Sequence, residues 1–169
     1  MQAIVSDVDG ISRNRSIQLL NKSNQFNLNG AKVSDSDLTN HLKRENHFAL
    51  CFRLKDKFGD NGIISVVLFN VEASTLNINN WVMSCRVLSR GMEQVVIDVL
   101  AKIALNNDIE LILGHWQNSG KNNLVKELYS RLGFDCITRN EVSSEWSIKT
   151  SNIQHNQIIE ISIKDLDLF

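Results

Sequence analysis

Hydrophobic residues alternate or run together along some segments of the chain and recur at helical spacing in others. Two β-rich runs, residues 47–56 and 63–73, flank the polar stretch 57–62, which supplies the glycines and the Asp-Asn pair of a reversal. This pattern predicts a β-hairpin. Residues 75–88 predict a third strand, and residues 110–116 predict a short buried one. Residues 134–140 and 144–150 predict a closing pair of strands.

Helical spacing is clearest over residues 92–107, where apolar residues recur three and four positions apart. These residues are Met92, Val95, Val96, Val99, Leu100, Ile103 and Ala104. Weaker patterns predict helices over residues 15–27 and 36–45, and another over residues 122–132 that ends at Gly133. Residues 158–163 alternate like an edge strand, although helix and disorder are alternatives for the last part of the chain.

The predicted order is two helices, three strands, a helix, a strand, a helix and two strands. A strand therefore leads through a helix to a second, parallel strand, which predicts an α/β fold with a mixed sheet and helices on both faces. The length of 169 residues fits one domain. We expect an N-terminal arm over residues 1–14, a core over 15–149 and a tail over 150–169.

The composition of the chain disfavours several classes of protein. Eighteen basic and nineteen acidic residues leave a formal net charge of -1, which does not favour binding to nucleic acid or an anionic membrane. The cysteines Cys51, Cys85 and Cys136 are widely spaced, so the sequence predicts neither a disulfide framework nor a metal site. The N-terminus has two aspartates instead of a basic start, and no apolar run is long enough to span a membrane. A reducing cytoplasm is the expected location.

The segment after the strand at 110–116 resembles the closing motif of the GNAT acyltransferase superfamily, N-x-x-A-x-x-x-Y-x-x-x-G-F. The motif is matched at Asn122, Tyr129, Gly133 and Phe134, whereas Val125 stands where alanine is usual. A separation of seven residues is two helical turns, which would put Asn122 and Tyr129 on one face. The resemblance implies that Asn122 contacts a pantetheine arm and that Tyr129 protonates the leaving thiolate. A core aromatic and a helix-start residue are the structural alternatives.

A second family feature is a loop of the form Q/R-x-x-G-x-G/A that holds the coenzyme A diphosphate at a helix start. The matching stretch is LSRGMEQ, in which Gly91 fits but Leu88 and Glu93 do not. A carboxylate in the first helical turn competes with a diphosphate for the same dipole, and Arg90 or Arg86 could offset it. The sequence therefore leaves two thioester donors open: acyl-coenzyme A and a phosphopantetheine arm on a carrier protein.

A wider resemblance covers about residues 15–149. The strings QLLNKSNQFNL, FRLKDKFGDNGIISVV, WVMSCRVLSRGMEQVVI and KNNLVKELYSRLGF are similar to the C-terminal, GNAT-like domain of the FkbH family. That resemblance implies a GNAT-like fold, a link to methoxymalonyl-type extender units for polyketides, and an acyl carrier protein or a separately encoded HAD-like domain as partner. In that family the HAD-like domain carries the transfer chemistry.

Two further motifs mimic phosphate chemistry. The opening AIVSDVDGI has the aspartate spacing of the HAD signature at Asp7 and Asp9, but Ile11 departs from it and no room remains for that fold. We interpret it as a coincidence. The stretch GHWQNSGKN resembles a P-loop with one spacer residue too many and Asn122 in place of serine or threonine. Lys121 could still bind an isolated anion at the helix start.

The predicted site is an acyl-thioester groove between residues 84–87 and 114–116. Ser84, Cys85, Arg86 and Val87 would border it, with backbone N–H groups of the strand polarising the thioester carbonyl. Cys85 is interpreted as a small hydrophobic residue of the strand, and a nucleophile is the less favoured alternative. His115, at the end of its strand, is the candidate general base, with a hydrogen-bonded structural histidine as the alternative. The predicted function is GNAT-type acyl transfer; a non-catalytic module that docks a carrier protein or HAD-like partner is the alternative.

Overall fold

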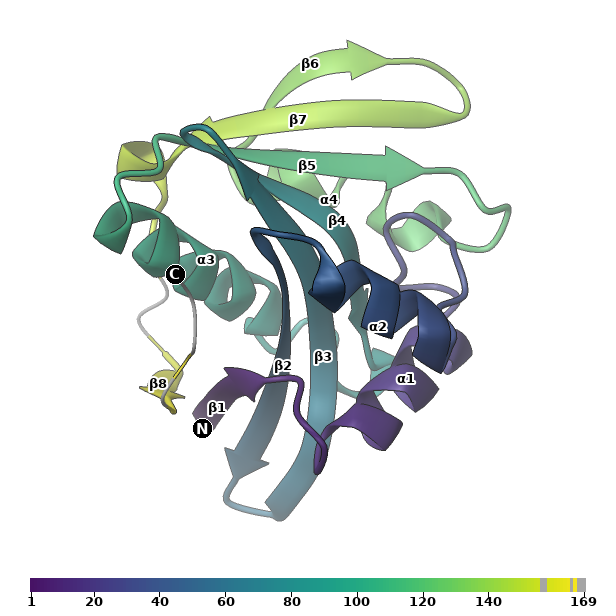
Figure 1. The fold of residues 1–169 in the computed structure, drawn as a ribbon, viewed down its shortest axis with the longest axis vertical. Helices are drawn as coiled ribbons and strands as arrows, with labels where there is room; N and C mark the ends of the chain where they lie inside the picture. The colour runs from purple at the N-terminus through teal and green to yellow at the C-terminus, as the bar shows by residue number, and fades with distance from the viewer. Residues whose placement is uncertain (156–157, 165, 167–169) are drawn as a thin grey trace.

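A computed structural model describes residues 1–155, 158–164 and 166, and the described strands form one mixed sheet (Figure 1). The strand order is β6-β7-β5-β4-β3-β2-β1-β8. The strands are β1 (Gln2–Asp7), β2 (His47–Asp56), β3 (Gly59–Glu72), β4 (Thr75–Met83), β5 (Leu111–Gln117), β6 (Asp135–Arg139), β7 (Ser143–Lys149) and β8 (Glu160–Ile163). Neighbouring strands are antiparallel except for the parallel pairs β4–β5 and β1–β8. The predicted α/β mixed sheet is confirmed.

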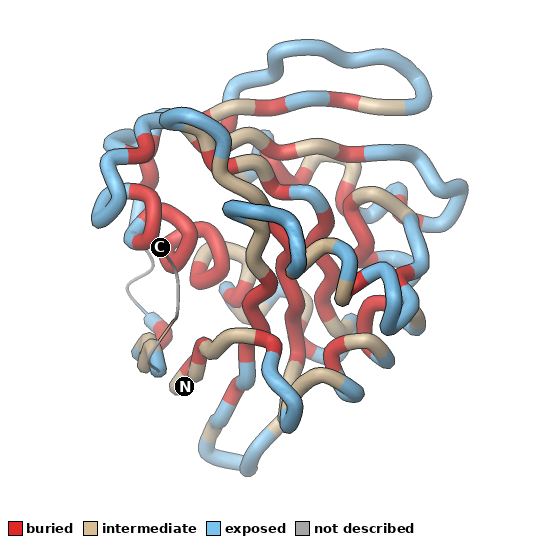
Figure 2. The backbone as a smooth tube through the Cα atoms, in the orientation of Figure 1, coloured by how far each residue is buried: buried red, intermediate tan, exposed pale blue. Residues whose placement is uncertain are grey.

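Helices cover both faces of this sheet. The α-helices are α1 (Arg13–Lys22), α2 (Asp35–Lys43), α3 (Met92–Asn106) and α4 (Leu128–Arg131), and short 3-10 turns are η1 (Cys85–Val87), η2 (Asn123–Val125) and η3 (Thr150–Asn152). α3 and α4 lie in the larger hydrophobic core, whereas α1 and α2 pack over a smaller one on the opposite face. Figure 2 shows α3 buried along most of its length and β6 exposed. The predicted helix over 92–107 is confirmed.

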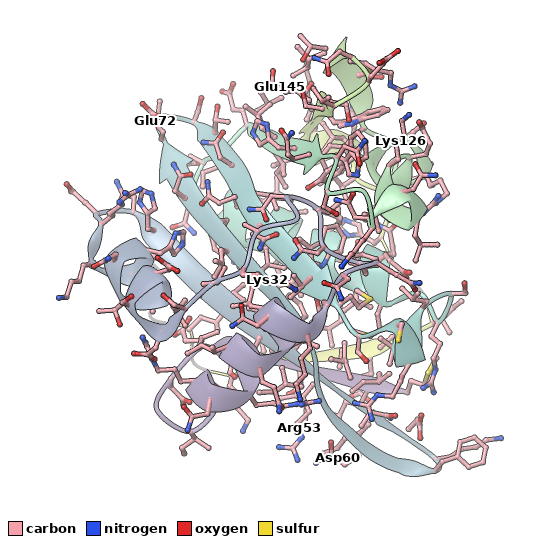
Figure 3. All side chains as sticks on the ribbon, turned by 90° about the vertical axis from the view of Figure 1, so that its right-hand side faces the viewer. Lys32, Arg53, Asp60, Glu72, Lys126 and Glu145 are labelled. Atoms are coloured by element: carbon pink, nitrogen blue, oxygen red, sulfur yellow. The ribbon has the colours of Figure 1, made fainter. Side chains whose placement is uncertain are left out.

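The hairpin follows from its turn chemistry. β2 and β3 pair in antiparallel register from His47↔Asn70 to Asp56↔Gly59, which confirms the predicted reversal. Gly59 and Gly62 have φ of 134° and 69°, values that a residue with a Cβ adopts only with strain. Arg53 and Asp60 form an ion pair near the tip of the hairpin, where Figure 3 shows them side by side.

The two ends of the chain correct the predicted boundaries. Residues 1–14, expected to be an arm, contain β1, in which Ala3 and Val5 are fully buried. The apolar alternation over 158–163 does form an edge strand, β8, which pairs with β1. Two short segments far apart in the sequence thus pair as neighbouring strands. Neither segment alone has enough apolar residues to indicate a core strand. Residues 156–157, 165 and 167–169 of the predicted tail lie outside the described residues.

Three predicted elements are shorter than expected. The helix over 15–27 ends at Lys22, because Asn21 donates its side-chain N–H to the backbone oxygen of Val33 and so draws the returning chain against the helix end. The strand over 75–88 ends at Met83, and the chain then turns through η1, which buries Val87. The helix over 122–132 is broken into η2 and α4. So short a segment has little helical stability of its own, and tertiary contacts decide its conformation.

None of the described helices is long and apolar enough to cross a membrane.

Candidate functional site

The parallel strands β4 and β5 diverge soon after they begin. They pair only over Thr75–Asn77 and Leu111–Leu113, and beyond these residues a third segment enters between them. The backbone N–H of Met83 donates to Phe26 O at 3.1 Å, Leu28 N–H donates to Trp81 O at 3.0 Å, and Gln117 N–H donates to Leu28 O at 2.9 Å. We call residues 26–28 the inserted segment. It fills the divergence between β4 and β5 with the chain's own backbone.

Side chains hold the inserted segment in place. Phe26 and Leu28 are buried in the larger core, and the Phe26 ring meets the Trp81 ring edge-on at a centroid distance of 5.4 Å. Asn122 is fully buried, and its Nδ2 donates to Asn27 O and Gln117 O, both at 2.8 Å. Its Oδ1 accepts from Ser119 N–H at 2.9 Å. Asn122 therefore ties the inserted segment to the β5 end, and its amide is committed within the protein instead of facing a pantetheine arm.

Tyr129 lies beneath this divergence. Its ring packs against β5 at Gly114, where an added Cβ would come within 2.3 Å of the ring. The hydroxyl is buried and makes no hydrogen bond with any described residue. Burial raises the pKa of the Tyr129 phenol, and the His115 backbone N–H lies close enough to oppose this shift without completing a hydrogen bond. The predicted pairing of Asn122 and Tyr129 on one helical face is wrong, because the segment that carries them is not a continuous helix.

Three of the backbone donors predicted on residues 83–87 are used inside the fold. Met83 N–H bonds to the inserted segment, Ser84 N–H donates to Ile64 O at 2.7 Å, and Val87 N–H donates to Ser84 O at 3.2 Å. The prediction that residues 84–87 continue the strand is wrong, because Cys85–Val87 form η1; their role in binding a thioester stays a prediction. The chain leaves the sheet at Met83 because Val87 is buried in the core below.

The loop before α3 is also engaged by other parts of the chain. Arg90 forms an ion pair with Asp56, and this guanidinium, together with the Phe58 backbone N–H, lowers the pKa of the Asp56 carboxyl to about 2. An added Cβ on Gly91, whose φ is 82°, would lie 3.9 Å from the Ile159 side chain, and Glu93 stands in the first turn. The described conformation does not fit an inserted thioester, because the inserted segment fills the divergence and Arg90 is already paired.

Four of the predicted residues do come together, at the end of β4 on the α1 side of the sheet. Ser84, Cys85, Arg86 and Lys121 line a cavity of about 850 Å³. The remaining lining comes from α1 and the chain that follows it: Arg15, Gln18, Leu19, Lys22, Ser23, Asn24, Gln25 and Phe26, with Met83 at the end of β4. We call this cavity the basic groove.

His115 is not among the residues that line the basic groove. It lies opposite Glu145 on β7, with His115 Nδ1 3.5 Å from Glu145 Oε1, and both side chains are partly exposed. Along β5, Gly114 faces the Tyr129 ring, so the next residue projects to the opposite face of the sheet. The role of His115 as a general base stays a prediction.

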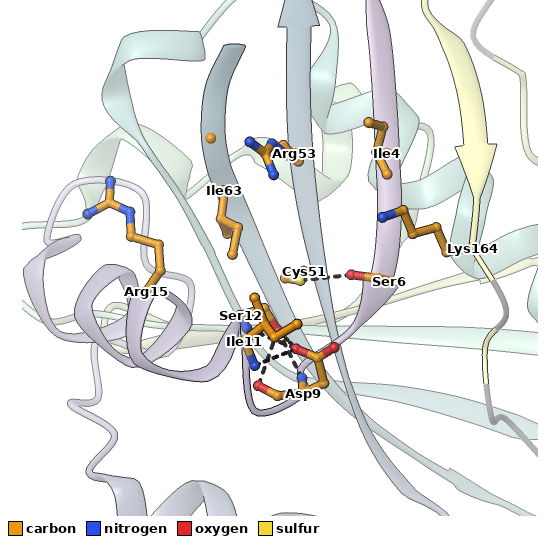
Figure 4. Close-up of a pocket in the computed structure, with 11 residues that line it drawn as sticks. Ile4, Ser6, Asp9, Ile11, Ser12, Arg15, Cys51, Arg53, Ile63 and Lys164 are labelled. Atoms are coloured by element: carbon orange, nitrogen blue, oxygen red, sulfur yellow. Dashed lines mark hydrogen bonds between the residues drawn. The ribbon is translucent and has the colours of Figure 1, made fainter.

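A second cavity, of about 350 Å³, lies between β1, β2 and the start of α1 (Figure 4). Asp9 lines it, and its carboxylate accepts from the Ile11 and Ser12 backbone N–H groups and from the Ser12 hydroxyl. These bonds lower the pKa of the Asp9 carboxyl. Asp9 thus shapes the turn into α1. No group of three or more histidine, cysteine or acidic side chains gathers in a metal-binding arrangement within the described ranges.

Sequence analysis missed the inserted segment. Gly30, with a φ of 69°, brings the loop after the inserted segment so close to Ser119 that an added Cβ would lie 2.5 Å from the Ser119 Cβ. The density of asparagines between Asn21 and Asn29 was the available signal, since Asn21, Asn27 and Asn29 all bond to backbone groups in this region.

Comparisons with known proteins identify the fold. No protein-family model and no curated protein matches the sequence. Among solved structures, the ribosomal-protein-S18-alanine N-acetyltransferase from Escherichia coli has a TM-score of 0.68 at 12% identity, over 92% of this chain and 99% of that one. A PaiA N-acetyltransferase from Thermoplasma acidophilum, in complex with coenzyme A, has a TM-score of 0.69 at 11% identity, over 88% and 99%.

The spermidine N-acetyltransferase from Vibrio cholerae, in complex with coenzyme A and spermine, is also similar. Its TM-score is 0.65 at 13% identity, over 89% of this chain and 96% of that one. These likenesses show that the chain has the fold of the GNAT acetyltransferases and confirm the predicted fold. At such low identity they show the fold alone.

Proposed function

We propose that the chain is a GNAT-type acyltransferase, which moves an acyl group from a thioester such as acyl-coenzyme A to an amine or hydroxyl. The observation that carries this proposal is Tyr129, the only tyrosine of the chain. Its hydroxyl is buried without a hydrogen-bond partner among the described residues, next to the divergence of β4 and β5. A buried hydroxyl without a partner costs about 1–3 kcal/mol, a cost that a catalytic role explains.

The raised pKa of the Tyr129 phenol sets its protonation state. The phenol stays protonated at neutral pH, so it can donate its proton as the acyl carbon–sulfur bond breaks. The acceptor nitrogen or oxygen forms the new bond to the acyl carbon, and the thiolate takes the phenol proton. The acceptor's own proton passes to solvent, and the phenolate then regains a proton from solvent. His115 remains the sequence-based candidate for relaying the acceptor's proton.

The inserted segment must leave β4 before a thioester can reach Tyr129. It now holds the Met83 N–H and the Trp81 carbonyl, so its departure would free both backbone groups at the strand edge. Loop movements of this kind commonly precede chemistry in enzymes. Acyl transfer in this protein therefore depends on opening of the inserted segment.

The experiment measures thiol release from acetyl-coenzyme A, and separately from an acylated carrier protein, with amine and hydroxyl acceptors. Tyr129→Phe keeps the ring and removes the hydroxyl. We expect its rate to fall about 10²- to 10⁴-fold, the usual contribution of a general acid, while its unfolding free energy rises by about 1 kcal/mol. A Tyr129→Phe protein with unchanged transfer and lower stability would contradict the proposal.

A non-catalytic binding module is the second candidate, favoured by the filled divergence. This function is the one that the resemblance to the FkbH family implies. The domain would dock an acyl carrier protein or a HAD-like partner in methoxymalonate or polyketide biosynthesis. The support for it is the similarity of the sequence strings. It predicts carrier-protein binding by calorimetry without thiol release from either donor.

A further inference from the structure

The basic groove has the size and shape of a small-molecule site. Its volume of about 850 Å³ lies within the range of cavities that hold small organic ligands. Residues from α1 and the chain after it form one side, and the end of β4 with η1 forms the other. Lys121, from the loop after β5, completes the lining.

The charge of the lining is one-sided. Arg15, Lys22, Arg86 and Lys121 contribute four positive charges, and no aspartate or glutamate of the described part of the chain lines the groove. This is notable in a chain whose net charge is -1. Charges of one sign in a cavity raise the local concentration of ligands of the opposite sign.

The four cations have no carboxylate partner among the residues that the structure describes, whereas several arginines elsewhere do. Arg13 pairs with Asp35, Arg53 with Asp60, Arg90 with Asp56 and Arg139 with Glu127. Within the groove, Arg15 donates to the neutral Gln18 side chain, and Arg86 donates to the Ser84 hydroxyl at 3.3 Å. Guanidinium groups that meet only neutral partners keep their capacity to bind oxyanions.

The rest of the lining supplies neutral hydrogen-bonding groups and an apolar floor. The neutral polar groups are Gln18, Ser23, Asn24, Gln25 and Ser84, and the buried apolar side chains are Leu19, Phe26 and Met83. A ligand with an organic body and charged oxygens would use both kinds of surface. An inorganic ion alone would leave the apolar part unused.

We propose that the basic groove binds a small, multiply charged organic anion. Phosphate esters and polycarboxylates both carry this chemistry. The inference concerns binding alone and does not rest on the acyltransferase proposal. The groove shares Ser84, Cys85, Arg86 and Lys121 with the predicted thioester site, but its lining includes neither Tyr129 nor the loop at Gly91. The same four charges disfavour ammonium ligands by repulsion.

The experiment titrates the protein with a phosphate ester (fructose 1,6-bisphosphate), a polycarboxylate (citrate) and a polycation (spermine), using calorimetry without any acyl donor. We expect one of the two anions to bind with a stoichiometry of one and spermine not to bind. The double variant Arg86→Gln/Lys121→Gln should weaken binding about tenfold or more, as expected for loss of charge-assisted hydrogen bonds. The matched control, Arg131→Gln/Lys149→Gln, removes the same charge from exposed residues elsewhere and should bind as before.

Cys85 gives a readout that locates the ligand. It is exposed in the groove, whereas Cys51 is buried, so a Cys136→Ser background leaves Cys85 as the accessible thiol. The bound anion should slow Cys85 modification by a thiol reagent at least about tenfold at saturation, since occupancy shields the groove.

Each other outcome overturns the inference. Equal weakening by the control pair would mean that only net charge matters, and binding of neither anion or unprotected Cys85 would mean that the groove is not the site. Competition by desulfo-coenzyme A would make the groove part of a donor site. Because no acyl donor is needed, failure here leaves the thiol-release experiment unaffected, and failure of acyl transfer leaves this titration unaffected.

Discussion

The divergence of β4 and β5 and the basic groove are adjacent regions with opposite characters. The divergence is buried and filled by the inserted segment, and its polar backbone groups form hydrogen bonds with each other. The groove is open and lined by four cations without carboxylate partners among the described residues. Phe26 belongs to both, since it supplies a backbone bond to β4 and also lines the groove.

This difference separates stability from binding. Side chains in the divergence contribute to the core, so their substitution should cost unfolding free energy. Unpaired like charges in the groove repel one another, so their substitution should cost little or nothing. The protein thus gathers like charges at a surface that a ligand can reach.

The largest effect should come from emptying the divergence. Leu28→Ala removes a buried side chain between β4 and β5, and we expect it to lower the unfolding free energy by about 3 kcal/mol in urea denaturation. Leu124→Ala, at a half-exposed leucine in η2, is the matched control and should change it by less than about 0.5 kcal/mol. Equal effects would show that the inserted segment does not contribute to the core.

Overpacking the same region should have the next largest effect. Gly114→Ala places a methyl group within 2.3 Å of the Tyr129 ring, which is held between Trp81 and Phe134, and should cost about 2 kcal/mol. Gly10→Ala has open space around the added methyl group and a φ outside the left-handed region, so it should be nearly neutral. If Gly114→Ala leaves the unfolding free energy unchanged, the Tyr129 ring does not pack against Gly114.

Acid should weaken the contact that occupies Arg90. The pKa of the Asp56 carboxyl is lowered from 3.8 to about 2. The ion pair therefore contributes fully to the unfolding free energy at pH values above 3.8, and this contribution is lost as the pH falls toward 2. Asp56→Asn should therefore flatten the decline of unfolding free energy between about pH 5 and 2. Asp135→Asn, at an exposed aspartate of β6, should leave the slope as in the parent protein, and an unchanged slope in Asp56→Asn would contradict the assignment.

The smallest effect should come from the groove. Arg86→Gln removes one of four like charges, so we expect stability to stay the same or to rise by a few tenths of a kcal/mol at low salt. Arg131→Gln serves as the control for loss of a surface arginine. A loss above about 1 kcal/mol in Arg86→Gln alone would show that the groove is structural.

The sequence by itself determined the elements whose signals are local. The apolar period of residues 92–107 required a helix packed on one face, and the turn residues around Gly59 and Gly62 required a reversal. The family motif at Tyr129 and Gly133 indicated the fold. These features depend on residues a few positions apart, which a single sequence displays directly.

Only the tertiary structure decided that the inserted segment fills the space between β4 and β5. Asn122 bonds to Asn27, 95 residues away, and the backbone of the inserted segment bonds to both β4 and β5. No local pattern records such pairings, because backbone N–H and C=O groups are the same in every residue type. The short segment after Asn122 lost its predicted helix for the same reason: contacts across the fold outweigh a propensity that a few residues express only weakly.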